Sequence, residues 1–128
     1  MFYVLVSGGR NYTNKDKVFY YLDKIVKAKK DIIIVHGGAR GADSLASLFC
    51  TQNNIQEKIF NAEWDKYGKK AGYIRNLEMN NFLNNQRRLD NGIFALIFPG
   101  GRGTQNMHVL CIENKIPYYK IEQRNGHE

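Results

Sequence analysis

Three short apolar runs in this chain each end in a cluster of glycines, which constrains its fold more than any other feature. The runs and clusters occupy residues 4–10 (VLVSGGR), 33–41 (IIVHGGARG) and 96–104 (LIFPGGRGT). A buried strand that ends in a glycine turn and leads into a helix brings backbone N–H groups close to an anion. One glycine pair alone is also compatible with a plain tight turn. Three together predict a nucleotide pocket at one edge of a parallel sheet.

The spacing of apolar residues predicts alternating strands and helices. Such alternation, with continuous apolar strands, is typical of a parallel sheet covered by helices on both faces. Ligands of these sheets bind at the carboxyl ends of the strands, where all three glycine clusters fall. Runs bounded by Gly, Asn or Pro predict strands at residues 2–6, 32–35, 55–60, 93–98 and 117–121.

Four helices are expected between the strands. The Thr-Asn-Lys-Asp of residues 13–16 has the spacing of a capping box at the start of the first helix. The third helix is expected at residues 73–89 and the fourth at residues 104–114. The expected inward residues are Val18, Leu22, Ile25 and Val26 in the first helix, Leu45, Leu48 and Phe49 in the second, and Met107, Leu110 and Cys111 in the fourth.

The aromatic residues at 19–21 of the first helix exceed what one core stripe requires. We therefore expect a homo-oligomer.

The length of 128 residues suits one domain, which we expect to span residues 1–121 and to leave 122–128 as a flexible tail. No stretch approaches the ~20 apolar residues of a membrane span, and residues 1–6 are too short for a signal peptide. We therefore expect a soluble cytoplasmic protein.

The formal net charge of +7 predicts attraction to anions. Nucleic acid, an acidic protein and a small phosphorylated ligand are all compatible with this charge.

The cysteines and histidines do not form a pattern typical of catalysis or metal binding. Cys50 and Cys111 lie far apart among apolar neighbours and are expected to be reduced packing residues. His36 at a strand end has no carboxylate partner at close spacing, so a hydrogen-bonded packing role is favoured over acid–base work. Residues 37–41 also lack the Gly-Lys-Ser/Thr ending of a P-loop. We expect neither a metal nor a cofactor.

Each glycine cluster brings an arginine whose guanidinium fork matches phosphate oxygens: Arg10, Arg40 and Arg102. Two neighbouring residues each have two interpretations. Asp43 either places an acid in the first turn of a helix or accepts a hydrogen bond from a ribose hydroxyl. Thr104 either caps the fourth helix or helps to hold a phosphate.

Aromatic and charged residues crowd into residues 62–79. Trp64 and Tyr67 are candidates to stack on a base, and Arg75 is a candidate to reach a phosphate or ribose. The alternative for Trp64 is a core anchor beneath the loop.

Four segments, in order, resemble the YspA-related family of the SLOG superfamily. They are residues 7–12 (SGGRNY), 36–43 (HGGARGAD), 62–79 (AEWDKYGKKAGYIRNLEM) and 98–104 (FPGGRGT). The resemblance covers nearly the whole chain and implies an α/β fold: a Rossmann-like three-layer sandwich of about five mostly parallel strands flanked by helices. It also implies a site for a nucleotide or a nucleotide-derived signal. The superfamily includes the Lonely Guy (LOG) phosphoribohydrolases and DprA-like proteins.

Two departures from the superfamily's patterns bear on function. Asn106 stands where the phosphoribohydrolases carry a glutamate, and an amide cannot transfer a proton as a carboxylate does. Their mechanism therefore does not carry over, although Glu63, Asp65 or Glu78 could substitute in a hydrolase of different layout. Gly-Tyr at residues 72–73 replaces the expected Gly-Pro, which would add the Tyr73 ring to the edge of the pocket.

We expect a protein that binds a nucleotide-derived small molecule, as a bacterial sensor or as a sequestering protein such as a phage counter-defence factor. An N-glycosidase acting on nucleotides or NAD-type molecules is the enzymatic alternative, with no catalytic residue assigned. A single-stranded nucleic acid binder is the third, although no aromatic-basic alternation supports it. The predicted ligand-binding residues are Ser7, Gly8, Gly9, Arg10, Gly37, Gly38, Ala39, Arg40, Asp43, Trp64, Tyr67, Arg75, Asn76, Gly100, Gly101, Arg102, Gly103 and Thr104.

Overall fold

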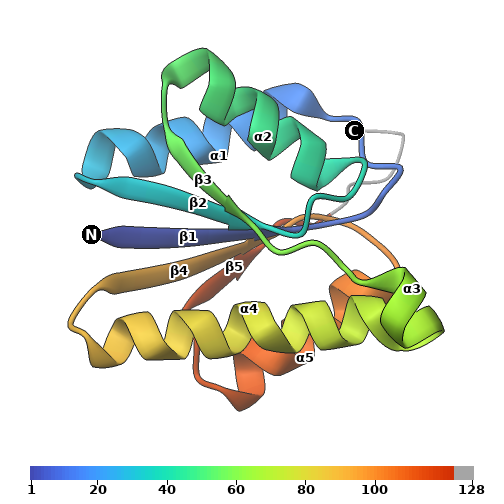
Figure 1. Ribbon diagram of the computed structural model, residues 1–128. Coiled ribbons are helices and arrows are strands. Elements are labelled where there is room, and N and C mark those ends of the chain that lie inside the picture. The colour runs from blue at the N-terminus through green and yellow to red at the C-terminus, as the bar shows by residue number, and fades with distance from the viewer. Residues whose placement is uncertain (123–128) are drawn as a thin grey trace.

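The computed structural model describes residues 1–122, so the expected tail lies, apart from Glu122, outside the described residues. Five strands form one all-parallel sheet in the order β3-β2-β1-β4-β5 (Figure 1). The predicted α/β class is confirmed, and the first strand is the central one. The strands are β1 (Phe2–Ser7), β2 (Ile32–His36), β3 (Gln56–Ile59), β4 (Gly92–Ile97) and β5 (Tyr118–Lys120).

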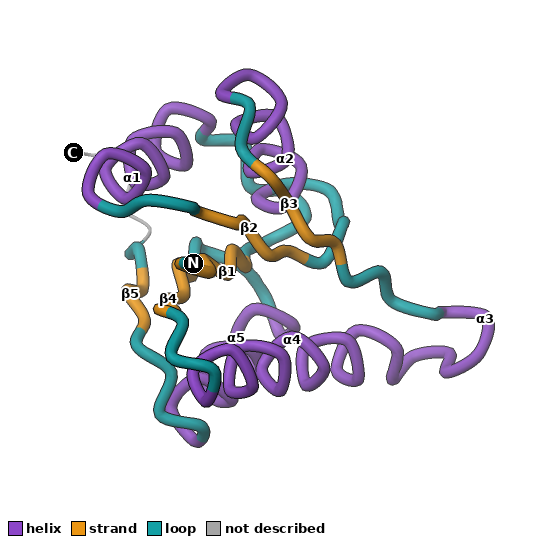
Figure 2. Tube along the Cα trace, turned by 60° about the vertical axis from the view of Figure 1, so that its left-hand side comes forward, coloured by secondary structure: helices purple, strands orange, loops and turns teal. Residues whose placement is uncertain are grey.

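Helices cover both faces of the sheet, which confirms the predicted three layers (Figure 2). One face is covered by α1 (Lys15–Ala28) and α2 (Ala42–Asn53), and the other by α4 (Ala71–Arg88) and α5 (Arg102–Glu113). A short helix, α3 (Trp64–Tyr67), and a 3₁₀ turn, η1 (Gly68–Lys70), connect β3 to α4. Within residues 1–122, no helix combines the length and hydropathy needed to cross a membrane.

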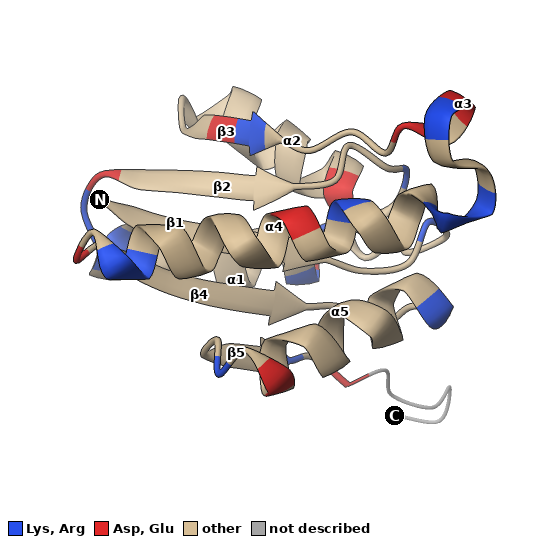
Figure 3. Cartoon of the chain, turned by 60° about the horizontal axis from the view of Figure 1, so that its bottom comes forward, with Lys and Arg blue, Asp and Glu red and all other residues tan. Residues whose placement is uncertain are grey.

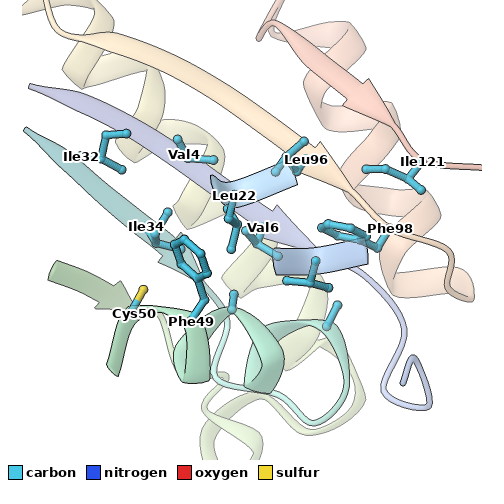
Figure 4. Packing of buried hydrophobic residues seen from close by; sticks show 13 residues of the cluster. Val4, Val6, Leu22, Ile32, Ile34, Phe49, Cys50, Leu96, Phe98 and Ile121 are labelled. Atoms are coloured by element: carbon cyan, nitrogen blue, oxygen red, sulfur yellow. The ribbon is translucent and has the colours of Figure 1, made fainter. Parts of the chain in front are cut away.

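The core has one apolar cluster on each side of the sheet, because alternate residues of a strand point to opposite faces. In β1, Val4 and Val6 pack toward α1 and α2, where Leu22 and Phe49 complete the cluster (Figure 4). Tyr3 and Leu5 join the cluster on the other face, with Met79, Leu83 and Met107 from α4 and α5. Burial on both faces explains why β1 is a continuous apolar run in the sequence.

Helix α1 begins one residue later than the capping pattern suggested. Asn14, and not Thr13, is the N-cap, and its side-chain oxygen accepts a 3.1 Å hydrogen bond from the Lys17 backbone N–H. Asp16 lies in the first turn, where a negative charge favours the helix dipole. The expected core residues Val18 and Leu22 are fully buried, which fixes the face that α1 turns to the sheet.

Two expectations about apolar helix faces need correction. Leu48 is 37% exposed, because α2 directs Ala46, Phe49 and Cys50 inward instead. In α1, Phe19 packs edge-on against Phe49 and Tyr21 packs edge-on against Phe98, while the neighbouring residue Tyr20 is 56% exposed. The aromatic surplus that suggested an oligomer is therefore mostly used within the chain, and oligomerisation stays a prediction.

Candidate functional site

The three glycine loops meet at the carboxyl ends of β1, β2 and β4. The Gly9 N–H donates to the Pro99 carbonyl at 2.9 Å, and the Gly9 carbonyl accepts from the Ala42 N–H at 3.2 Å. Gly41 has a φ of +77°, and a Cβ there would overlap the Gly9 carbonyl. A Cβ on Gly100 would lie 2.6 Å from the Gly9 nitrogen. These close backbone approaches require glycine and hold the loops together.

A cavity of about 360 Å³ opens between these loops and the start of α4. The amino-terminal turn of α5 faces it, and the cap residue Gly101 supplies no side-chain hydrogen bond, so first-turn N–H groups have no intrahelical partner. Thr104 lies in the first turn of α5 and is not its cap, which corrects one of the two interpretations. The lining residues are Val6, Ser7, Gly8, Gly9, Arg10, Ala39, Asp43, Trp64, Lys69, Gly72, Tyr73, Arg75, Asn76, Met79, Gly101, Arg102, Gly103 and Thr104.

Positive charge dominates the lining of this cavity. Arg10, Lys69, Arg75 and Arg102 line it, against a single carboxylate from Asp43. Figure 3 shows Lys and Arg at the turn between α3 and α4, beyond the carboxyl ends of the strands. Guanidinium groups beside unpaired backbone N–H groups favour a phosphate or carboxylate. Four lining residues, Val6, Lys69, Gly72 and Met79, were not predicted for the site, although they lie within the segments that the sequence analysis singled out.

Arg75 and Asn76 connect α4 to two of the loops. The Arg75 Nη1 donates to the Gly37 carbonyl at 2.7 Å, and its Nε donates to the Asn76 Oδ1 at 3.2 Å. Both Asn76 amide hydrogens are used, toward the Gly103 carbonyl and the Asn106 Oδ1, each at 3.0 Å. Burial lowers the pKa of the Arg75 guanidinium, although nearby Asp43 raises it. Asn76 therefore positions the loops, whereas Arg75 both braces a loop and faces the cavity.

Asp43 lies where one of its two interpretations places it, in the first turn of a helix, and contact with a ribose hydroxyl stays a prediction. It lies in the first turn of α2, is only 6% exposed, and lines the cavity. Its Oδ2 accepts from the Gly37 and Ala39 N–H groups at 3.1 and 3.2 Å, so it fixes the second glycine loop. Desolvation raises the pKa of this carboxyl, against the opposing effect of those hydrogen bonds.

We compare the free energy of unfolding of Asp43→Asn with that of wild type. The value for the variant minus the value for wild type is expected to increase as pH rises from about 4 to 7. Because burial raises the Asp43 pKa above its ordinary 3.8, the folded protein holds this proton more tightly than the unfolded chain. The stability that the protonated carboxyl contributes is complete below 3.8 and is lost as pH rises through the folded-state pKa. Asparagine stays neutral and keeps an acceptor oxygen. Urea unfolding of both proteins across this range measures the difference, and a constant difference contradicts the prediction.

Aromatic side chains line the outer part of the cavity. Trp64 is 47% exposed, which rules out the core-anchor interpretation, and the Arg10 guanidinium lies 5.3 Å from its ring centre. Tyr73 also lines the cavity, as the Gly-Tyr departure suggested. Tyr67 was predicted for the site but does not line this cavity. Trp64 and Tyr73 are therefore the aromatic residues available to a bound base.

The candidate carboxylates for a hydrolase do not face the cavity. Among residues 1–122, Glu63, Asp65 and Glu78 are absent from its lining. Asn106, at the position of the phosphoribohydrolase glutamate, accepts from Asn76. The site thus has one carboxylate, Asp43, and that group already holds the second glycine loop.

A second cavity, of about 370 Å³, adjoins the first. It accounts for three predicted residues that the first cavity lacks, Gly37, Gly38 and Arg40. Gly100 lines neither, and instead borders a separate hollow with His108 and Lys120. The residues lining the second cavity are Arg10, Gly37, Gly38, Ala39, Arg40, Asn61, Ala62, Trp64 and Arg75. Asn61 and Ala62 were not predicted.

His36 has the carboxylate partner that sequence spacing did not reveal. Its Nε2 lies 2.7 Å from the Glu57 Oε1 on β3, and its Nδ1 accepts from the Gly38 N–H at 3.0 Å. Ser47 donates to the other Glu57 oxygen at 3.2 Å. His36 is buried with both ring nitrogens bonded, so it supports the second glycine loop, but Glu57 is the carboxylate partner whose absence had argued against acid–base work. Cys50 and Cys111 are free and buried, as expected, and desolvation raises the pKa of each thiol to about 12.

This chain is similar to one phage protein, to one solved chain and to one family model. Over 82 residues the chain is 35% identical to the Gene 61 protein of Mycobacterium phage D29, a match that covers 59% of this chain and 66% of that protein. A solved chain described as a predicted subunit of tRNA methyltransferase from Methanocaldococcus jannaschii matches 99% of this chain and 71% of its own length, at 13% identity and a TM-score of 0.38. The sequence model of the YspA, cpYpsA-related SLOG family matches residues 2–67, from β1 through α3. The chain therefore belongs to the YspA-related SLOG family.

Proposed function

We propose that this protein binds a nucleotide or a nucleotide-derived small molecule in the cavity of about 360 Å³. The observation that carries the proposal is the convergence of three glycine loops and four cationic side chains on one space. Family membership supports the same conclusion, because SLOG proteins are expected to act on nucleotide-related ligands. The cavity volume lies near the lower end of the range of about 300–1,000 Å³ that is typical of small-molecule sites.

The lining gives each part of a nucleotide a counterpart. Phosphate oxygens would accept from the first-turn N–H groups of α5 and from Arg102. Asp43 can accept from a ribose hydroxyl, since a carboxylate offers two oxygens and its Oδ2 is the one that braces the loop. The base would pack against Trp64 or Tyr73 at the outer rim.

We favour binding without turnover. Cleavage of an N-glycosidic bond needs a carboxylate placed to transfer a proton or to stabilise positive charge. Asp43 uses its Oδ2 to hold two backbone N–H groups of a loop, and the position at which the phosphoribohydrolases carry a glutamate is the amide of Asn106, which accepts from Asn76. A protein of this kind would sense its ligand or sequester it.

Thermal denaturation in the presence of nucleoside monophosphates, cyclic nucleotides, ADP-ribose and NAD tests the proposal. At a hundredfold excess over its Kd, a true ligand raises Tm by about 10 °C, because binding to the folded state stabilises it by mass action. Arg102→Ala is expected to weaken calorimetric affinity about tenfold or more, through loss of a charge-assisted hydrogen bond. Chromatography of the incubated ligand should recover it intact.

Lys24→Ala is the matched control, since Lys24 lies on α1, on the opposite face of the sheet from α4, and bonds only to Tyr20 in the described chain. It should bind the ligand as wild type does. If no nucleotide shifts Tm, the proposal is wrong. Free base among the products would instead establish the hydrolase alternative.

A further inference from the structure

We propose that the two adjoining cavities are subsites for one ligand of the pyrophosphate-linked class, a nucleoside diphosphate whose distal phosphate carries a second sugar or nucleoside. This rests on the proposed function, since the first cavity must hold a nucleotide. Four residues line both cavities: Arg10, Ala39, Trp64 and Arg75. The two cavities therefore adjoin along these four residues.

The residues that line both cavities include two guanidinium groups, those of Arg10 and Arg75, which can bind phosphate. A Cβ on Gly72 would lie 3.6 Å from the Trp64 Cη2 and 3.8 Å from the Arg75 Nη2, so ring and guanidinium both lie over this glycine. Arg75 uses its Nη1 and Nε for internal hydrogen bonds, and its Nη2 points toward the space near Gly72. Arg10 lies over the Trp64 ring. Two guanidinium groups thus border both cavities and can bind a linkage that crosses between them.

The second cavity has the chemistry of an anion and sugar subsite. Arg10, Arg40 and Arg75 line it, and none of its described lining residues is acidic. Asn61 adds an amide that can donate to or accept from a sugar hydroxyl, and a Cβ on Gly38 would lie 2.6 Å from its Oδ1. Gly38 has a φ of +68°, so the loop bends around this side chain.

Charge favours one ligand that occupies both cavities. Arg102 lines the first cavity and not the second, whereas Arg40 lines the second and not the first. Arg10 and Arg75 line both, and we call these four residues the arginine row. A single phosphate in one cavity can reach at most three of them. A ligand with two linked phosphates that occupies both cavities can reach all four.

Isothermal titration calorimetry with paired probes tests the proposal. The four nucleoside 5′-monophosphates are each compared with a pyrophosphate-linked counterpart that carries a sugar: ADP-ribose, GDP-mannose, CDP-glucose and UDP-glucose. For the base that the site accepts, the counterpart is expected to bind at least about tenfold more tightly, since it gains charge-assisted hydrogen bonds in the second cavity. Arg40→Ala should reduce this ratio to less than about twofold. Arg88→Ala, at the far end of α4, should leave the ratio as in wild type.

The outcomes separate this proposal from the proposed function. If a monophosphate binds and its counterpart binds no more tightly, the two-subsite proposal is wrong and nucleotide binding stands. A preference for the counterpart that survives Arg40→Ala also overturns it, because the gain would then arise elsewhere. Tighter binding of a single-stranded DNA tetranucleotide than of every pyrophosphate-linked probe would assign the arginine row to nucleic acid instead. If no nucleotide binds, both proposals fail.

Discussion

Replacing Gly41 with alanine is expected to lower the free energy of unfolding by about 2 to 4 kcal/mol, the largest effect of any single methyl group in the loops. The φ of +77° at Gly41 is strained for alanine, and the added Cβ would overlap the Gly9 carbonyl. That carbonyl accepts from the N–H groups of Ala42 and Tyr12. The substitution therefore drives the first and second loops apart. Urea unfolding of purified protein measures the loss.

Gly103→Ala is the matched control for this prediction. Gly103 lies in the first turn of α5, and a Cβ there meets nothing within 4 Å. Its replacement should change the free energy of unfolding by less than about 1 kcal/mol, through helix propensity alone. Equal losses in the two variants would mean that the contact between Gly41 and Gly9 does not hold the loops.

Arg75→Ala is expected to abolish detectable ligand binding and to lower the free energy of unfolding by about 2 to 4 kcal/mol. The variant loses the hydrogen bonds to the Gly37 carbonyl and to Asn76, and it leaves buried Asp43 without its neighbouring cation. Calorimetry with the tightest nucleotide of the panel measures affinity, and urea unfolding measures stability. Unchanged stability would contradict the bracing role.

Arg75→Lys separates the positive charge from the guanidinium fork. An ammonium group keeps the charge, but it is one compact donor group and cannot reproduce the two fixed N–H directions toward Gly37 and Asn76. We expect Arg75→Lys to bind the nucleotide at least about tenfold more weakly than wild type. Wild-type affinity in this variant would show that charge alone matters. Arg88→Ala, which loses only an exposed hydrogen bond to Asn85 within α4, should behave as wild type in both measurements.

The glycine clusters predicted most of what positions the site. In a parallel sheet all carboxyl ends lie on one edge, and the central position of β1 places its loop between those of β2 and β4. The alternation of apolar runs predicted the parallel sheet, and the convergence of the three loops then follows from the central position of β1. Among the residues that line the cavity from α3 and the start of α4, Trp64 and Arg75 were predicted from the crowding of aromatic and charged residues, and Tyr73 from the departure at residues 72–73.

Contacts that depend on register or on side-chain direction could not be predicted. Glu57 reaches His36 because β3 pairs with β2 so that Glu57 lies opposite Ile34, and nothing in the local sequence fixes that pairing. Arg75 was expected to reach a ligand, yet its strongest described contact is the Gly37 carbonyl, 38 positions away in the chain. Leu48 was misplaced because α2 buries small residues where the apolar spacing favoured a leucine.

The central position of β1 has a consequence for how the chain is made. Phe2 pairs with Ile32 on one side and with Gly92 on the other, so during synthesis of this part of the chain β1 can join β2 first but must wait for β4. During that interval one edge of an apolar strand stays open, and such an edge can template association between nascent chains. The arrangement that brings the loops together thus also creates a period in biosynthesis when the growing polypeptide depends on shielding, by the ribosome or by chaperones.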